Sequence, residues 1–137
     1  SLIAYEAGFK LNRPNSRING SIFIYDYDDY QAMQFDAFVP LIFNAGAEMS
    51  GFELDIISNP SDGVDLVLGV SYLDAEITNL PAGTYPGGVS KSVVSPDLAL
   101  NATARKSWIR PSGGMVTAQV DMSYKDDQVF NIVVSPL

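Results

Sequence analysis

The sequence contains no histidine and no cysteine, so paired carboxylates are the first candidates for acid/base chemistry. Glu53 and Asp55 alternate with apolar residues, which would place them about 7 Å apart on one face of a β-strand. A carboxylate pair at this distance can hydrolyse a glycosidic bond. No aromatic residues that would line a sugar cleft are evident around the pair. We therefore interpret both as inward-facing polar residues, on the face opposite the apolar residues, and Asp74 and Glu76 in the same way.

A second acidic group, residues 26–29, reads Asp-Tyr-Asp-Asp. Clustered oxygen ligands suit Ca²⁺, but the glycine and the distal glutamate of an EF-hand loop are missing. We interpret this group as a solvated strand end that enters a loop.

The remaining candidates also favour structural roles. Trp108 could stack on a ligand, but packing or an interfacial position explains it better. Neither Gly87-Gly88 nor Gly113-Gly114 is followed directly by Lys-Ser/Thr and a helix, so they indicate turns rather than a phosphate loop. Arg105 and Lys106 are too isolated to form a basic patch. We therefore predict no catalytic, cofactor-binding or metal-binding residue and no cofactor, and the sequence leaves the ligand-binding residues unknown.

Composition limits the class of protein further. The chain has 137 residues, 47% of them hydrophobic, which is enough for one domain with a core. The absence of cysteine and histidine excludes disulfides, thiolate chemistry, histidine zinc sites and a Ser-His-Asp triad. The net charge of −8 and the isoelectric point near 4.2 argue against binding to nucleic acid. No apolar run reaches the roughly 20 residues that a transmembrane helix needs.

Period-two alternation of apolar and polar residues predicts about six strands and no helix. The clearest feature is a hairpin of two strands, 44–58 and 64–78, joined by a polar corner at 59–63. Other strands are expected at 3–12, 17–33, 98–108 and 116–125, although the facing of 17–33 cannot be assigned because both faces are apolar. Short turns are predicted at 13–16, 59–63 and 110–114, long loops at 34–43 and 79–95, and no closing strand after 126.

The alternation of short and long connections is typical of outer-membrane barrels, which have short periplasmic turns and long outer loops. Tyr72, Trp108 and Tyr124 lie near expected strand ends, as in the aromatic girdles of such barrels. A soluble β-sandwich would show the same alternation, with the apolar face as its core. The residue pattern alone leaves the membrane barrel and the sandwich open.

The residues themselves, beyond their apolar and polar pattern, favour the membrane barrel. In order and in register, several segments along nearly the whole chain resemble TonB-dependent outer-membrane receptors. These segments are residues 5–10, 23–31, 44–46, 51–55, 62–63, 69–76, 95–101 and 121–124.

The resemblance implies an all-β, antiparallel, up-and-down portion of a transmembrane barrel of roughly 22 strands, truncated at both ends and covering residues 1–137. It implies outer-membrane lipid as a partner, and energised uptake of iron-siderophore complexes, cobalamin or glycans through regions outside this chain that engage an inner-membrane complex. It implies no enzymatic activity. Candidate residues lining the lumen are Glu6, Lys10, Glu53, Asp55, Thr117, Gln119 and Asp121.

Six strands cannot close a barrel, because the smallest barrels of this type have about eight. Unpaired edges invite pairing with other chains. We therefore expect the isolated chain to self-associate through its strand edges, or to pack as an open sheet or a sandwich. The alternative function is that of a soluble β-sandwich binding module. A convergent enzyme would need an acid/base site that the sequence does not reveal.

Overall fold

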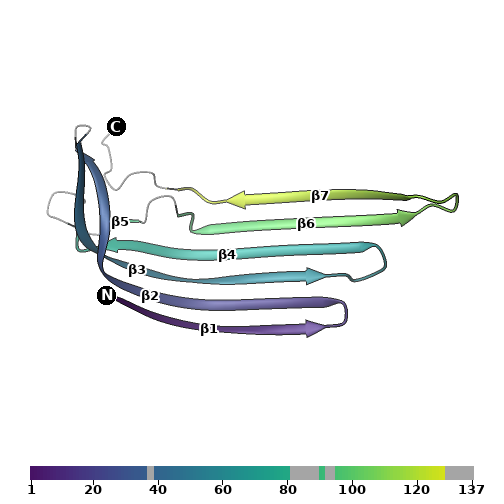
Figure 1. Ribbon diagram of the computed structural model, residues 1–137, viewed down its shortest axis with the longest axis horizontal. Coiled ribbons are helices and arrows are strands. Elements are labelled where there is room, and N and C mark those ends of the chain that lie inside the picture. Colours follow the sequence, from purple (N-terminus) through teal and green to yellow (C-terminus); the bar gives the residue numbers. More distant parts are fainter. Residues whose placement is uncertain (37–38, 81–89, 92–94, 129–137) are drawn as a thin grey trace.

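The computed structural model describes residues 1–36, 39–80, 90–91 and 95–128. They form one antiparallel sheet with strand order β1-β2-β3-β4-β6-β7, and the short β5 pairs with the end of β4 (Figure 1). None of these residues forms a helix, so the described part of the chain contains no helix that could cross a bilayer. The meander of six long strands confirms the predicted fold class. The strands are β1 (Leu2–Arg13), β2 (Ser16–Asp36), β3 (Val39–Ser58), β4 (Val64–Thr78), β5 (Ser90–Lys91), β6 (Leu98–Ile109) and β7 (Met115–Lys125).

The three predicted short turns are present, and all lie at one end of the sheet, which we call the short-turn end (Figure 1). Gly63 has a φ of +69°, and a Cβ there would lie 2.5 Å from the carbonyl oxygen of Ser107. A glycine is required because the backbone of β6 approaches so closely. Gly113 and Gly114 also have positive φ, which confirms their interpretation as turn residues.

The predicted loop at 34–43 was wrong. β2 continues to Asp36 and β3 begins at Val39, with those two residues paired. Pro40 suggested a loop because it cannot donate to a strand ladder, but it is accommodated in this outer part of β3. The alternation of apolar and polar residues fails here because, among the described residues, this part of the hairpin pairs with neither β1 nor β4. It follows a β-bulge between Tyr27 and Tyr30 and turns away from the main sheet (Figure 1).

The other long connection agrees in part with the prediction. Within 79–95, residues 90–91 form β5, with Lys91 paired to Glu76 of β4. Residues 81–89 and 92–94, which include Gly87 and Gly88, lie outside the described residues. Residues 126–128 are not in a strand, as predicted, and the rest of the C-terminal segment lies outside the described part of the chain.

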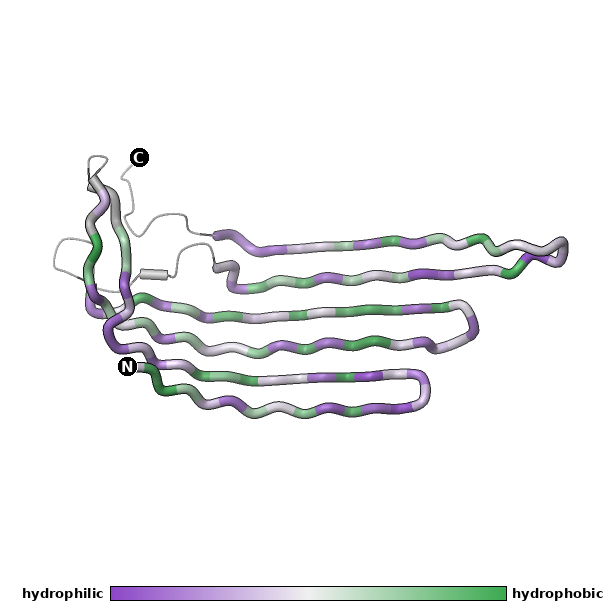
Figure 2. Tube along the Cα trace, in the orientation of Figure 1, coloured by the Kyte–Doolittle hydropathy of each residue, from purple (hydrophilic) through white to green (hydrophobic). Residues whose placement is uncertain are grey.

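Directly paired residues share a face of a sheet, so the register divides the long strands into two faces. One face, the apolar face, carries alternate residues of every long strand, and Figure 2 shows the resulting alternation of hydropathy along the strands. Many of its side chains are exposed: Ile22 is 61% and Val120 is 71% accessible. Its members include Tyr5, Phe9, Ile22, Phe52, Leu54, Leu68, Val70, Leu100, Ala102, Val120 and Met122.

The sheet is a single open layer. Its accessible surface is 9802 Å², whereas a compact monomer of this mass would expose about 7,000 Å². In the described part of the chain, a small cluster of buried residues consists of Ala32, Ala45, Ile77 and Leu80, with Tyr30 and Phe43 packed against it. No second sheet covers the apolar face among the described residues, so the chain has the expected open-sheet form rather than that of a sandwich.

Candidate functional site

The seven residues predicted to line a lumen all lie on the face opposite the apolar face, which we call the polar face. Glu53 pairs with Ser21, which pairs with Gly8, two residues from both Glu6 and Lys10. The same rows continue through β4 and β6 to β7. The strand alternation thus correctly predicted that these residues share one face, because a strand places every second side chain on the same face.

An ion pair organises the polar face near the short-turn end. The Arg105 guanidinium of β6 approaches Asp65 Oδ2 of β4 at 2.6 Å through Nη2 and donates to it at 2.7 Å through Nε. The other Asp65 oxygen accepts a hydrogen bond from the Asn59 side chain in the β3–β4 turn. These contacts tie the turn to two strands. Both charged side chains are at least a third exposed, so the pair contributes less than about 1 kcal/mol.

A second set of contacts links β6 to β7. Asp121 Oδ1 accepts a hydrogen bond of 2.7 Å from the Thr103 hydroxyl, and both its oxygens accept from the Gln119 amide. The hydroxyls of Ser107 and Thr117 lie 3.0 Å apart, two rows of the polar face closer to the short-turn end. Three of the seven predicted residues therefore hold the sheet together, and their hydrogen-bonding groups are engaged within it.

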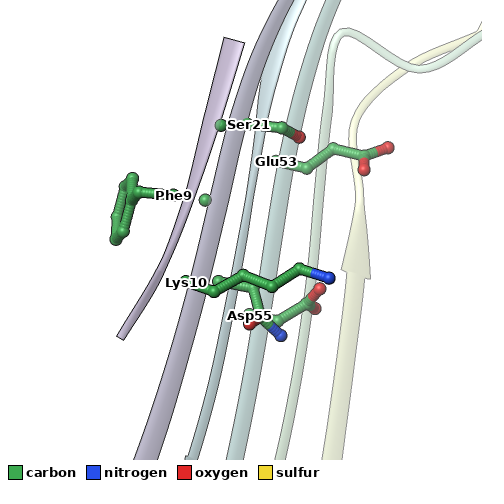
Figure 3. A pocket seen from close by; sticks show the side chains of 8 residues that line it. Phe9, Lys10, Ser21, Glu53 and Asp55 are labelled. Atoms are coloured by element: carbon green, nitrogen blue, oxygen red, sulfur yellow. The ribbon is translucent and has the colours of Figure 1, made fainter. Parts of the chain in front are cut away.

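The other half of the polar face is different. Lys10, Asn19, Ser21, Glu53 and Asp55 line a depression of about 450 Å³ whose floor includes two glycines. Figure 3 shows Lys10, Ser21, Glu53 and Asp55 extending to the same side of the sheet, with the Phe9 ring on the other side. Among the described residues, the charged groups of Lys10, Glu53 and Asp55 make no ion pair. They are free to bind a group from outside the sheet.

An aromatic ladder rises from this depression along β2, and the sequence did not reveal it. Its neighbouring ring centroids lie 5.1 Å, 6.5 Å and 6.4 Å apart. The Tyr25 hydroxyl donates a hydrogen bond to Glu6, so this ring is fixed to β1. The two-residue spacing of the first three rings was visible in the sequence, but the apolar residues between them hid which face the rings occupy. The ladder consists of Phe23, Tyr25, Tyr27 and Tyr30.

Polarity reverses at the end of the sheet that lies away from the short turns. The interpretation of Asp74 and Glu76 was wrong: both lie on the apolar face, since Asp74 pairs with Ser50 and Glu76 with Glu48. The opposite face there packs the small buried cluster around Ile77. The apolar face therefore becomes polar at this end, where the strands continue past its last apolar residues.

The acidic group at 26–29 is not at a strand end. Asp26 lies inside β2 and pairs with Glu48 of β3. Asp28 and Asp29 occupy the bulge, where Asp29 has a φ of +60°. The bulge lets the hairpin turn out of the sheet. Within the described ranges, no three acidic side chains converge as a metal site would require.

The apolar face forms a band that ends at aromatic residues. On β4 the band runs from Val64 to Tyr72, after which Asp74 follows on the same face. Tyr72 and Tyr124 lie toward the end of the band that is away from the short turns. Trp108 lies next to the short-turn end and is 49% exposed. Rings at both limits of an exposed apolar band are the arrangement of a membrane girdle.

The chain matches the family described as TonB dependent receptor-like, beta-barrel, over residues 3–133. The chain belongs to this family. No solved structure matches it. Members of the family are outer-membrane receptors and transporters rather than enzymes, and membership implies the Gram-negative outer membrane as its location. The resemblance stated from the sequence is thereby confirmed.

Proposed function

We propose that this segment forms part of the wall of a receptor that takes up a large, scarce nutrient, such as an iron-siderophore complex, across the outer membrane. The apolar face meets lipid and the polar face lines the lumen. Energy comes from an inner-membrane complex that engages regions outside this chain.

The observation that carries the proposal is the exposure of the apolar band. In water, each exposed aliphatic side chain forgoes about 1.5–3 kcal/mol of burial free energy. The band contains such residues on every long strand, and no second layer of the described chain covers them. Contact with hydrocarbon removes this cost for all of them at once.

Site-directed spin labelling of the receptor in lipid vesicles tests the proposal. This segment contains no cysteine, so each thiol introduced on β4 is unique within it. Labels at Leu66, Leu68 and Val70 should collide often with oxygen and rarely with a water-soluble nickel complex. Labels at Val67 and Ser71 should show less oxygen contact.

A sandwich core would protect the apolar-face labels from both reagents, and that result would refute the membrane assignment. The cargo is tested separately, by uptake of radiolabelled ferric siderophore in cells with and without the receptor. Uptake that requires both the receptor and the proton-motive force is the expected result. Equal uptake without the receptor would remove iron-siderophore complexes as its cargo.

A further inference from the structure

Charge is divided unequally between the two borders of the apolar face. Next to the short turns, the charged strand residues of this face are Arg13 and Lys106, both basic. At the opposite border, four strand residues carry carboxylates, and Lys91 is the one base that the described residues place among them. The four are Asp26, Glu48, Asp74 and Glu76. The apolar face therefore ends in cations on the side of the short turns and in anions on the other side.

The stagger of the short turns relates their border to the membrane. The row of the last β1–β2 pair, Arg13–Ser16, continues across the sheet to Ala104 of β6, and the last β6–β7 pair contains Ile109, five residues further on. This stagger is about 17 Å along the strands across a width of about 19 Å, at roughly 3.3 Å per residue and about 4.8 Å between strands. A strand tilt of about 40°, which is usual in transmembrane barrels, brings these turns to one level. The cationic border therefore follows one membrane surface, and short turns are periplasmic.

Lys106 extends from the apolar face toward this surface. Its neighbours in the register row are Val64 and Ala118, both apolar, and its side chain is half-buried. Its Nζ donates a hydrogen bond of 2.9 Å to the carbonyl oxygen of Asp62 in the β3–β4 turn. A lysine of this kind covers apolar surface with its methylene groups while its ammonium reaches the polar boundary. The charge therefore lies at the level of the turns, where the phosphate groups of lipids are located.

The ammonium of Lys106 retains capacity to bind a further group. An ammonium has three N–H donors, and among the described residues it donates to one neutral carbonyl oxygen. No carboxylate in the described ranges forms an ion pair with it. Trp108 lies two residues nearer to the turn on the same face, and its exposed indole adds another N–H donor at this border. Phosphate oxygens accept hydrogen bonds and carry the opposite charge, so they match these donors.

We infer that Lys106 and Trp108 form a binding site for the head group of an anionic phospholipid in the periplasmic leaflet. The acyl chains of this lipid lie over the next row of the apolar face, Leu66, Ala104 and Val120. An anionic head group is favoured over a zwitterionic one, because the amine of a zwitterionic lipid repels the lysine ammonium. This inference rests on the proposed function, since it requires the apolar face to meet lipid.

Native mass spectrometry of the solubilised receptor tests the inference. The receptor is incubated with equal amounts of phosphatidylglycerol and phosphatidylethanolamine that carry the same acyl chains, and the lipid that remains bound is identified. We expect a preference for phosphatidylglycerol that Lys106→Gln reduces about fivefold, the contribution of one basic residue near an anionic lipid. Lys106→Arg should retain the preference. Arg105→Gln is the matched control, because it removes a positive charge from the adjacent residue but from the polar face, and it should leave the preference unchanged.

An equal preference in Lys106→Gln and the unmodified receptor overturns the inference, as does an equal loss in Arg105→Gln. The unmodified receptor provides a test that needs no variant: its preference should fall as the ammonium acetate concentration rises, and a preference insensitive to salt contradicts a charge contact. Glycerol phosphate in excess should not displace the lipid, because it lacks acyl chains. Displacement would assign the site to soluble phosphate esters and overturn the lipid assignment.

The spin labels on β4 separate a failure of this inference from a failure of the proposed function. If the labels report lipid contact while Lys106→Gln leaves the lipid preference unchanged, the head-group site is wrong and the membrane assignment stands. If the labels are protected from both reagents, the apolar face does not meet lipid and both proposals fail.

Discussion

Leu68→Arg places a charge on the apolar face of β4, and Val67→Arg places the same charge on the adjacent residue, on the polar face. The two positions lie in one strand, differ by one residue in depth, and both replace an aliphatic side chain. Their register partners differ in kind: Leu68 pairs with Ile56 and Ala102, and Val67 pairs with Ile57 and Thr103. The comparison therefore isolates the environment of each face.

The magnitude follows from the position of Leu68 in the apolar band. It lies four residues from each limit, Val64 and Tyr72, or about 13 Å along the strand at roughly 3.3 Å per residue. A strand tilt of about 40° reduces this to about 10 Å of depth, close to the bilayer midplane. An arginine on the lipid face there costs about 2–4 kcal/mol. We expect Val67→Arg to cost less than about 1 kcal/mol, because its guanidinium remains on the polar face near Asp65.

Urea titration of the receptor in lipid vesicles, monitored by the heat-modifiable mobility of the folded barrel, measures both free energies of unfolding. A loss of about 2–4 kcal/mol corresponds to roughly a 30- to 1000-fold change in the folding equilibrium. The two-faced assignment is refuted if Val67→Arg destabilises the barrel as much as Leu68→Arg, or if Leu68→Arg has no effect.

Three further predictions concern the sheet itself. The isolated 137-residue chain should self-associate in water, because both edge strands and the apolar face lack partners; a monodisperse monomer by light scattering without detergent would contradict this. Gly51→Ala should destabilise the barrel by about 1–3 kcal/mol, since the new Cβ meets the Tyr72 carbonyl oxygen. Gly20→Ala should cost less, because its Cβ meets the Phe9 ring, which can rotate away; an equal loss in urea titrations of both variants would argue against this distinction. Arg105→Gln should change stability by less than about 1 kcal/mol, and a larger, salt-insensitive loss would mean that this ion pair is shielded from water in the barrel.

Much of the fold could be predicted because it depends on local patterns. The hairpin around residues 59–63 and the strands ending at Trp108 and Lys125 follow from two-residue alternation and turn chemistry. The same alternation placed Glu53 and Asp55 on one face with Gln119. Prediction failed at residues 34–43 and at Asp74, where the strands continue beyond the apolar band. The apolar–polar alternation is lost there because the surroundings of the strands change, although the strands themselves do not end.

The sequence by itself determined the class of the sheet, its short turns and the family, since alternation and turn residues act over a few neighbouring positions. The tertiary structure decided which side chains meet across strands. It placed the β2 aromatic ladder on the polar face and bent the outer hairpin at the bulge beside Asp29. It also paired Asp65 with Arg105, whereas Glu53 and Asp55 form no ion pair with any described residue. The physical reason is register: partners across a sheet are tens of residues apart in the chain, and pairing of the strands sets which of them come into contact.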